Sequence, residues 1–171
     1  MKHVLSRVTI SVLTFTAIAT SVSLFWLSSE GLSRTTPAFR LTTFGGEVYS
    51  VESLKGKPAL LMFWAPWCQV CQRELPLLAQ FYLKQKPATL RVLAIGFADT
   101  RQHVEDFVKT RPSTFPFPTA YDAGDRVAGD FGVFATPTFV VLNAQGQIHL
   151  VHRGGGINQN PQYQAFLAGL K

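Results

Sequence analysis

The chain has 171 residues, the length of one ordinary domain with a short extra segment. Its residues are 47% hydrophobic, 12% aromatic and only 15% charged. Disordered chains have the opposite balance, so this composition excludes a disordered protein. The formal net charge is +6, and no basic run is longer than Lys55-Gly56-Lys57. We therefore expect a folded domain that does not bind nucleic acid, and the charge supports only a weak attraction to acidic partners or lipid headgroups.

The N-terminal segment differs from the rest of the chain. Residues 1–7 carry Lys2 and Arg7, whereas residues 8–27 contain no charged side chain. About 20 helical residues span a hydrocarbon core of about 30 Å, so a transmembrane anchor is the favoured interpretation. The alternative is a signal peptide cleaved near residues 31–33, and a buried core helix is disfavoured because the segment is apolar on every face.

Anchor and signal peptide both place the C-terminal bulk outside the cytoplasm, because the cations stay inside. We expect a cytoplasmic basic region at 1–7, the membrane segment at 8–27, a linker at 28–37 and one domain at 38–171. The predicted location is the bacterial cytoplasmic (inner) membrane, crossed once, with the domain on the periplasmic side. Cleavage of the leader would instead release a soluble periplasmic protein.

Strand and helix patterns alternate along residues 38–171. A hairpin is expected around Gly45-Gly46. Apolar runs typical of strands covered on both faces follow, at 59–64, 90–97 and 138–142, with 147–152 as an antiparallel partner of the last. Helices are expected at 68–85, 102–110, 125–131 and 161–170. The first of these contains Pro76, which predicts a kink, and its expected inward residues are Leu75, Leu78, Ala79, Tyr82 and Leu83.

This order of elements predicts an α/β sandwich with a mixed sheet, which begins with a right-handed β-α-β unit. In such sheets the functional site lies beyond the carboxyl ends of the parallel strands. Trp67 and Cys68 directly follow the first of those ends. Position and chemistry therefore indicate the same place.

Cys68 and Cys71 are the only cysteines in the sequence. Cysteines of exported proteins usually form structural disulfides, but a bridge closing so short a loop restricts the unfolded chain little. A redox pair explains the spacing better. At a helix start, free N–H groups and the helix dipole favour the thiolate, which lowers the cysteine pKa from about 8.5. Cys68 is then predicted to be the exposed nucleophile, and Cys71, one turn deeper, to resolve the mixed disulfide.

A metal site is the alternative use of this pair. Structural zinc needs four ligands, and the sequence has no second cysteine pair. His149 and His152 are expected on opposite faces of a strand, as ordinary surface residues. Two thiolates and a histidine would suit Cu(I), so a copper chaperone stays open as an alternative function. We predict no metal and no cofactor, and we disfavour an idle interaction module because it leaves the cysteine pair unexplained.

A resemblance to a known family is carried by two segments. Residues 63–71 read Phe-Trp-Ala-Pro-Trp-Cys-Gln-Val-Cys, and residues 132–137 read Gly-Val-Phe-Ala-Thr-Pro. With Arg-Glu-Leu-Pro at 73–76, they resemble membrane-tethered thioredoxin-like proteins of the TlpA/ResA/DsbE group, and most of all the ScsD-like branch. The likeness extends from about residue 38 to the end of the chain.

The resemblance implies a thioredoxin fold and exchange between protein dithiols and disulfides. Reduction of substrates is slightly favoured over oxidation, with electrons returned by a membrane donor of the DsbD/CcdA type. Cytochrome c maturation and protection of envelope thiols under copper stress are the pathways that it suggests. It also implies that Cys68 and Cys71 form the redox-active disulfide.

Residue roles in substrate binding are likewise carried over from the resemblance. It implies a cis peptide bond at Thr136-Pro137 that faces the cysteines, and contact between the substrate and Trp67, Thr136 and Pro137. The alternative for Pro137 is an ordinary proline at a strand start. Trp64 and Trp67 are expected to wall the site, although core packing would also explain Trp64.

Two acidic residues are candidates for tuning the cysteines. Met62 stands where cytosolic thioredoxins carry a buried acid that aids proton transfer to the deeper cysteine, and Asp99 lies where some ResA-like proteins place an acidic residue near the pair. Asp99 is offered for this role, with a helix N-cap near Thr100 as the alternative. Glu74, expected in the first helical turn, either moderates Cys68 or is a surface acid that stabilises the helix dipole.

Overall fold

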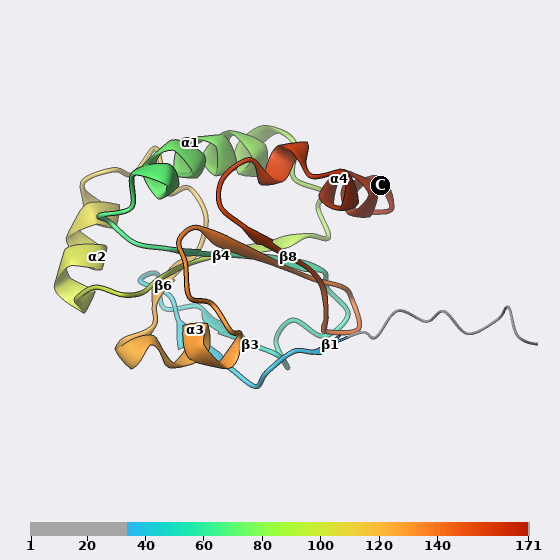
Figure 1. Cartoon of the computed structure of the whole chain (residues 1–171), viewed down its shortest axis with the longest axis horizontal. Helices are drawn as coiled ribbons and strands as arrows, with labels where there is room; N and C mark the ends of the chain where they lie inside the picture. Colours follow the sequence, from blue (N-terminus) through green and yellow to red (C-terminus); the bar gives the residue numbers. More distant parts are fainter. Residues whose placement is uncertain (1–33, 171) are drawn as a thin grey trace, which may run out of the picture. The chain divides into compact units, whose positions relative to one another are not determined.

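The computed structural model describes residues 34–170 (Figure 1). The predicted cytoplasmic region at 1–7, the membrane segment at 8–27 and most of the predicted linker lie outside the described residues. Within residues 34–170, none of the helices has the length and the apolar character that a membrane crossing requires.

A six-stranded sheet forms the centre of the domain, in the order β1-β8-β7-β4-β5-β6. Neighbours β4–β5 and β5–β6 are parallel, and the other pairs are antiparallel, so the predicted mixed sheet is confirmed. A separate hairpin contains β2 and β3. The strands are β1 (Arg34–Thr35), β2 (Arg40–Thr42), β3 (Val48–Ser50), β4 (Ala59–Trp64), β5 (Arg91–Gly96), β6 (Thr119–Tyr121), β7 (Thr138–Leu142) and β8 (Gln147–Arg153).

The start of the domain differs from the prediction. Arg34 and Thr35, assigned to the linker on sequence, pair with β8 as the edge strand β1. So short and polar a strand has no hydrophobic pattern of its own, because it depends on a partner far along the sequence. Arg34 and Thr35 are therefore part of the sheet, ahead of residue 38.

Four α-helices cover the sheet at the predicted places. They are α1 (Gln69–Lys84), α2 (Arg101–Lys109), α3 (Arg126–Asp130) and α4 (Pro161–Ala168), with short 3-10 turns η1 (Ala123–Asp125) and η2 (Ile157–Gln159). Helix α1 runs as one element through Pro76. The predicted inward position of Leu83 is wrong, since its side chain is 66% exposed. Phe81 is buried instead, because α4 covers that side of α1 and brings Tyr163 within 6.2 Å, centroid to centroid.

The core lies on both faces of the sheet, as the fully apolar strands require. Along β4, Met62 and Trp64 point into one cluster, which also contains residues of α1, α2 and α4. Leu61 and Phe63 point into a second cluster, built with the hairpin and α3. Figure 1 shows α1 and α4 on one side of the sheet and α3 on the other. Both clusters belong to one compact unit, Ser33–Lys171.

The strand registers define two ends of the sheet. They place Arg34, Ile148, Leu142, Ala59 and Arg91 in one row, which we call the amino end because β4 and β5 begin there. At the opposite, carboxyl end, β4 finishes at Trp64. Since α1 follows β4 after a short loop, it begins at the carboxyl end and returns toward the amino end.

Candidate active site

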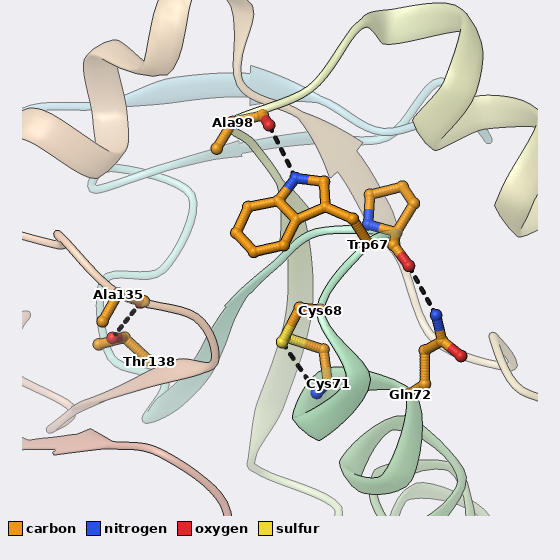
Figure 2. Close-up of a disulfide and its surroundings, with 8 residues drawn as sticks. Trp67, Cys68, Cys71, Gln72, Ala98, Ala135 and Thr138 are labelled. Atoms are coloured by element: carbon orange, nitrogen blue, oxygen red, sulfur yellow. Dashed lines mark hydrogen bonds between the residues drawn. A yellow bond between two sulfur atoms is a disulfide. The ribbon is translucent and has the colours of Figure 1, made fainter.

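Cys68 is the N-cap residue of α1, as the sequence predicts. Its backbone is extended (φ −80°, ψ 106°), and α1 begins at the next residue. The backbone N–H of Cys71 donates a hydrogen bond to Cys68 Sγ over 3.0 Å (Figure 2). One of the helix's free N–H groups thus points at this sulfur, where it would also stabilise a thiolate.

The two cysteines form a disulfide, with their Cα atoms 5.2 Å apart. Cys71 is fully buried, and Cys68 keeps 5% of its surface exposed. Cys68 is therefore the more accessible of the two, but it is far less exposed than expected. The reason is that both residues pack in the first core cluster together with Ala65.

Trp67 covers the surface next to the disulfide and is held by a neighbouring loop. The side chain is 56% exposed, and its Nε1 donates to the Ala98 carbonyl over 3.0 Å (Figure 2). Ala98 has a left-handed backbone (φ 53°), which costs a non-glycine residue about 1–2 kcal/mol. The Ala98 N–H donates to Asp125 Oδ1 over 2.8 Å, so both polar backbone groups of Ala98 are satisfied. Nothing in the sequence around Ala98 or Asp125 marks this support.

Trp64, in contrast, is a core residue. It is fully buried, and its ring centroid lies 5.5 Å from that of Phe107 and 5.0 Å from that of Phe115. The expectation that it walls the site is wrong, and the alternative of core packing is correct. The six-residue strand β4 alternates faces, and this places Trp64 beneath α2.

The Thr136–Pro137 bond is cis, as the resemblance implies. Thr138 pairs with Phe63, so Pro137 continues level with Trp64 at the carboxyl end. Thr138 Oγ1 donates to the Ala135 carbonyl over 2.7 Å, and Gly154 N–H donates to the Pro137 carbonyl over 2.8 Å. In the view of Figure 2, the segment with Ala135 and Thr138 lies across from Cys68. The structure thus brings the proline loop and the cysteine loop to the same end of the sheet.

Phe134 belongs to this loop and was not singled out in the sequence. Its side chain is 85% exposed, the most exposed of the large hydrophobic side chains described. It lies three positions before Pro137 in the segment that carries the resemblance. Phe134 and Trp67 are thus two exposed aromatic side chains in the loops that carry Pro137 and Cys68.

Glu74 lies in the second turn of α1, so its predicted place in the first turn is wrong. Its Oε1 accepts a hydrogen bond from the Gly156 N–H over 2.9 Å. A Cβ atom on Gly155 would approach Glu74 Oε1 to 2.6 Å and Val70 Cγ1 to 3.2 Å. A side chain on Gly155 would therefore displace the Glu74 carboxylate from Gly156 or crowd Val70, and the loop after β8 packs directly on the residues between and after the cysteines.

Asp99 is engaged at the start of α2. Its Oδ1 accepts from the Thr100 N–H over 2.6 Å, and its Oδ2 pairs with His103 Nδ1 at 2.8 Å. The N-cap is Thr100, whose hydroxyl accepts from the His103 N–H. Asp99 therefore supports the cap without being the cap residue. Its role toward the cysteines stays a prediction.

Both histidines of β8 contact the same core cluster, against the prediction of opposite faces. His149 packs on Phe166, with centroids 4.9 Å apart, and His152 on Phe139, at 6.1 Å. The register shifts opposite Val141–Leu142, and this irregularity turns His149 to the face of His152. Within the part of the chain that the structure describes, no three His, Cys, Asp or Glu residues gather as metal ligands would.

Comparison with known proteins agrees with this geometry. Residues 32–151 match the AhpC/TSA family. Thiol-disulfide oxidoreductase ResA of Bacillus cereus is 30% identical over 117 residues, which make up 68% of this chain and 66% of that protein. The alignment thus spans slightly less than two thirds of this relative.

Solved structures share the fold. StoA from Bacillus subtilis superposes with a TM-score of 0.65 and 26% identity, over 76% of this chain and 98% of that chain. A secreted Mycobacterium tuberculosis disulfide oxidoreductase homologous to E. coli DsbE gives a TM-score of 0.61 and 26% identity, over 74% and 95%. These proteins are almost fully covered by the described domain, so such a domain folds without further parts. The chain belongs to the AhpC/TSA family of thioredoxin-like proteins, among relatives named thiol-disulfide oxidoreductase ResA.

Proposed function

We propose that this protein is an extracytoplasmic thiol–disulfide oxidoreductase that acts on proteins through Cys68 and Cys71. The observation that carries the proposal is the disulfide at the N-terminus of α1, whose outer sulfur accepts the Cys71 N–H. The names of the relatives support the reaction class. The mycobacterial relative is a secreted protein, which supports export.

The reaction is a two-step exchange. The Cys68 thiolate attacks one sulfur of a substrate disulfide, and the other substrate sulfur leaves and takes up a proton. Cys71, deprotonated, then attacks Cys68 Sγ in the mixed disulfide, which releases the second substrate thiol and closes the Cys68–Cys71 bond. Two electrons pass from the pair to the substrate. The burial of Cys71 supports this order, because only Cys68 has surface open to a partner.

Substrate recognition is proposed for Trp67, Thr136 and Pro137, with Phe134 as an addition. Pro137 has no N–H, so the backbone of Thr136 offers the hydrogen bonds with which an extended substrate segment would pair. Trp67 and Phe134 present exposed aromatic rings to the side chains next to the substrate cysteine. Aromatic residues are well suited to such contacts because they bury a large area with few rotatable bonds.

The direction of electron flow is the finer part of the proposal. We favour reduction slightly, with a membrane donor of the DsbD/CcdA type restoring the dithiol. The placement in the ScsD-like branch and the link to cytochrome c maturation or copper stress stay predictions. Asp99 and Glu74 are retained as groups that moderate the cysteines. For Asp99, replacement by Asn should alter the pH dependence of Cys71 alkylation, and an unchanged profile would leave it only its contacts at α2.

The reduction potential of the pair, equilibrated against glutathione, tests both function and direction. A value near about −250 mV or below would mark a thiol donor, whereas about −120 to −180 mV would mark an oxidant or isomerase. A pair that fails to exchange with glutathione and does not accelerate insulin reduction would contradict the enzyme.

A Cu(I)-binding chaperone is the alternative function. The reduced pair would supply two neighbouring thiolates, which are soft ligands suited to Cu(I). Titration of the reduced protein with Cu(I), followed by competition with a chelator, separates the two functions. Tight stoichiometric binding without catalysis of disulfide exchange would favour the chaperone.

A further inference from the structure

Charge is divided unevenly between the two ends of the sheet. Exposed cations gather at the amino end, where Arg34 and Arg91 lie in the same row and Lys55 and Lys57 occupy the turn before β4. Helix α1 ends there too, and adds the exposed Lys84; Lys86, which follows, is half-buried, and its Nζ donates to the Pro87 and Leu90 carbonyls. The carboxylates at this end are Glu47 and Glu52, which the cations outnumber. Toward the carboxyl end, the acids Glu74, Asp99, Asp122 and Asp125 are balanced by Arg73, Arg101, Arg126 and Arg153.

Within residues 34–170, the cations of the amino end form no ion pairs with neighbouring carboxylates. Every ion pair within residues 34–170 involves Asp99 or α2. Glu47 lines a cleft of about 50 Å³ with Lys57 and Arg91 but forms no ion pair with either. The pKa of Glu52 is lowered by a hydrogen bond from its own backbone and by Ser50, with a further contribution from Lys55. This end therefore keeps a net positive surface that is open to a partner.

The remainder of the chain joins the domain at the same end. Arg34, the first residue of β1, lies in the amino-end row, opposite to the start of α1, and β1 runs toward that end because it is antiparallel to β8 (Figure 1). Residues 28–33, which separate the uncharged segment 8–27 from Arg34, reach about 21 Å at full extension. If residues 8–27 are in a membrane, Arg34 and the cations of its row lie within that distance of it. A tether of this length keeps the lipid headgroups at a high effective concentration around the domain, so even a weakly binding surface would be occupied.

We propose that the amino end of the sheet docks on the anionic lipid headgroups of the membrane, with Cys68 and Cys71 turned away from it. The proposal rests on the proposed export and anchoring and does not depend on the redox chemistry. With six residues in β4, the cysteines lie roughly 20 Å from the amino end, beyond the Debye length of about 8 Å. Docking thus orients the site toward soluble substrates, and a membrane electron donor must reach it with a domain of its own.

The test uses the domain 33–171, without the uncharged segment, so that only surface contacts can hold it on vesicles. Retention by sedimentation is compared on phosphatidylcholine vesicles and on vesicles with one third phosphatidylglycerol, at low salt. The variant is Lys55→Glu/Lys57→Glu. The control is Arg73→Glu/Arg126→Glu, which changes the net charge equally with exposed side chains toward the other end. Thermal melting establishes that each variant is folded.

We expect at least fivefold more retention on the anionic vesicles, lost at about 0.5 M salt, lost in Lys55→Glu/Lys57→Glu and largely kept in the control. Equal retention on both lipids, no retention on either, or an equal loss in the two variants would overturn the proposal. Binding to poly-glutamate without binding to vesicles would also overturn it, in favour of an acidic protein. Insulin reduction by the same variants is a separate readout, so a failure of docking and a failure of the proposed enzyme are distinguishable.

Discussion

The two ends of the sheet are built in different ways. At the carboxyl end, the Trp67 ring, the Ala98 peptide and the Asp125 carboxylate are joined by short hydrogen bonds, and Glu74 reaches across to Gly156. At the amino end, by contrast, charged side chains project from a turn and from strand and helix ends without ion pairs between them. One end holds a few atoms in fixed positions, whereas the other presents charge over a surface.

This difference predicts how each end responds to substitution. A group held by close contacts is sensitive to one added or removed atom, because the packed surroundings cannot yield freely. Exposed charges act through their sum, so single replacements matter little and paired reversals are needed to change binding. Substitutions at the active-site end should therefore have larger effects than single substitutions of the exposed charges at the amino end.

Loss of the outer sulfur should have the largest effect. Cys68→Ser is expected to lower the rate of insulin reduction at least about 10³-fold, since no other nucleophile is available at the site. Cys71→Ser should also be inactive but should accumulate a mixed disulfide, because the first step survives and the second does not. Nonreducing electrophoresis detects that adduct. If Cys71→Ser formed no adduct while Cys68→Ser did, the order of attack would be reversed.

A side chain on Gly155 should disturb the carboxyl end through packing alone. Gly155→Val places atoms against Glu74 Oε1 and Val70, and we expect a loss of about 3 kcal/mol in the free energy of unfolding. Chemical denaturation measures it. Gly129→Ala, in α3, is the matched control, because a Cβ there meets nothing within 4 Å and should be neutral or stabilising. Equal stability of the two variants would show that the loop after β8 yields easily.

The extent to which the sequence predicts this architecture follows from the range of the contacts involved. Strands β4, β5 and β7 are covered on both faces, and such strands are recognisable as apolar runs without knowledge of their partners. The cysteine pair and its helix are similarly local. Strand β1 and the support of Trp67 by Ala98 are not, because they depend on residues brought together only by folding. The hydrogen bond between Glu74 and Gly156 spans 82 positions, and no local sequence pattern near Glu74 predicts it.

Tyr49 offers a test of the amino end by pH. Burial, helped by Glu47 and opposed by Arg91, raises the pKa of Tyr49 from 10.0 to about 12. The folded state then holds the phenol proton where the unfolded chain releases it, so this contribution to stability is complete below pH 10 and is lost between pH 10 and 12. Between pH 10 and 12, the free energy of unfolding should therefore fall by about 2 kcal/mol less in Tyr49→Phe than in the parent protein. Identical slopes for the two proteins above pH 10 would contradict it, and their slopes at about pH 7 to 9 serve as the control.

The smallest effect is expected for the aromatic surface beside the proline loop. Phe134→Ser removes an 85% exposed ring that supports nothing in the core, so stability and the reduction potential should be unchanged. If the ring contacts substrate, kcat/KM for insulin should fall about threefold to tenfold, the range of a modest contact residue at an interface.

A second substrate and a second variant distinguish a contact with insulin from other causes of a loss in rate. Glutathione disulfide presents far less surface than insulin to residues outside the cysteine pair, so we expect its rate to be unaffected by Phe134→Ser. Leu83→Ser changes a 66% exposed apolar residue at the other end of α1, and it should leave both substrates unaffected. A loss shared by insulin and glutathione disulfide would mean that Phe134 acts on the cysteine pair itself. A loss shared with Leu83→Ser would mean that exposed apolar area anywhere on the domain promotes binding. Substrate binding would then not be confined to the carboxyl end of the sheet.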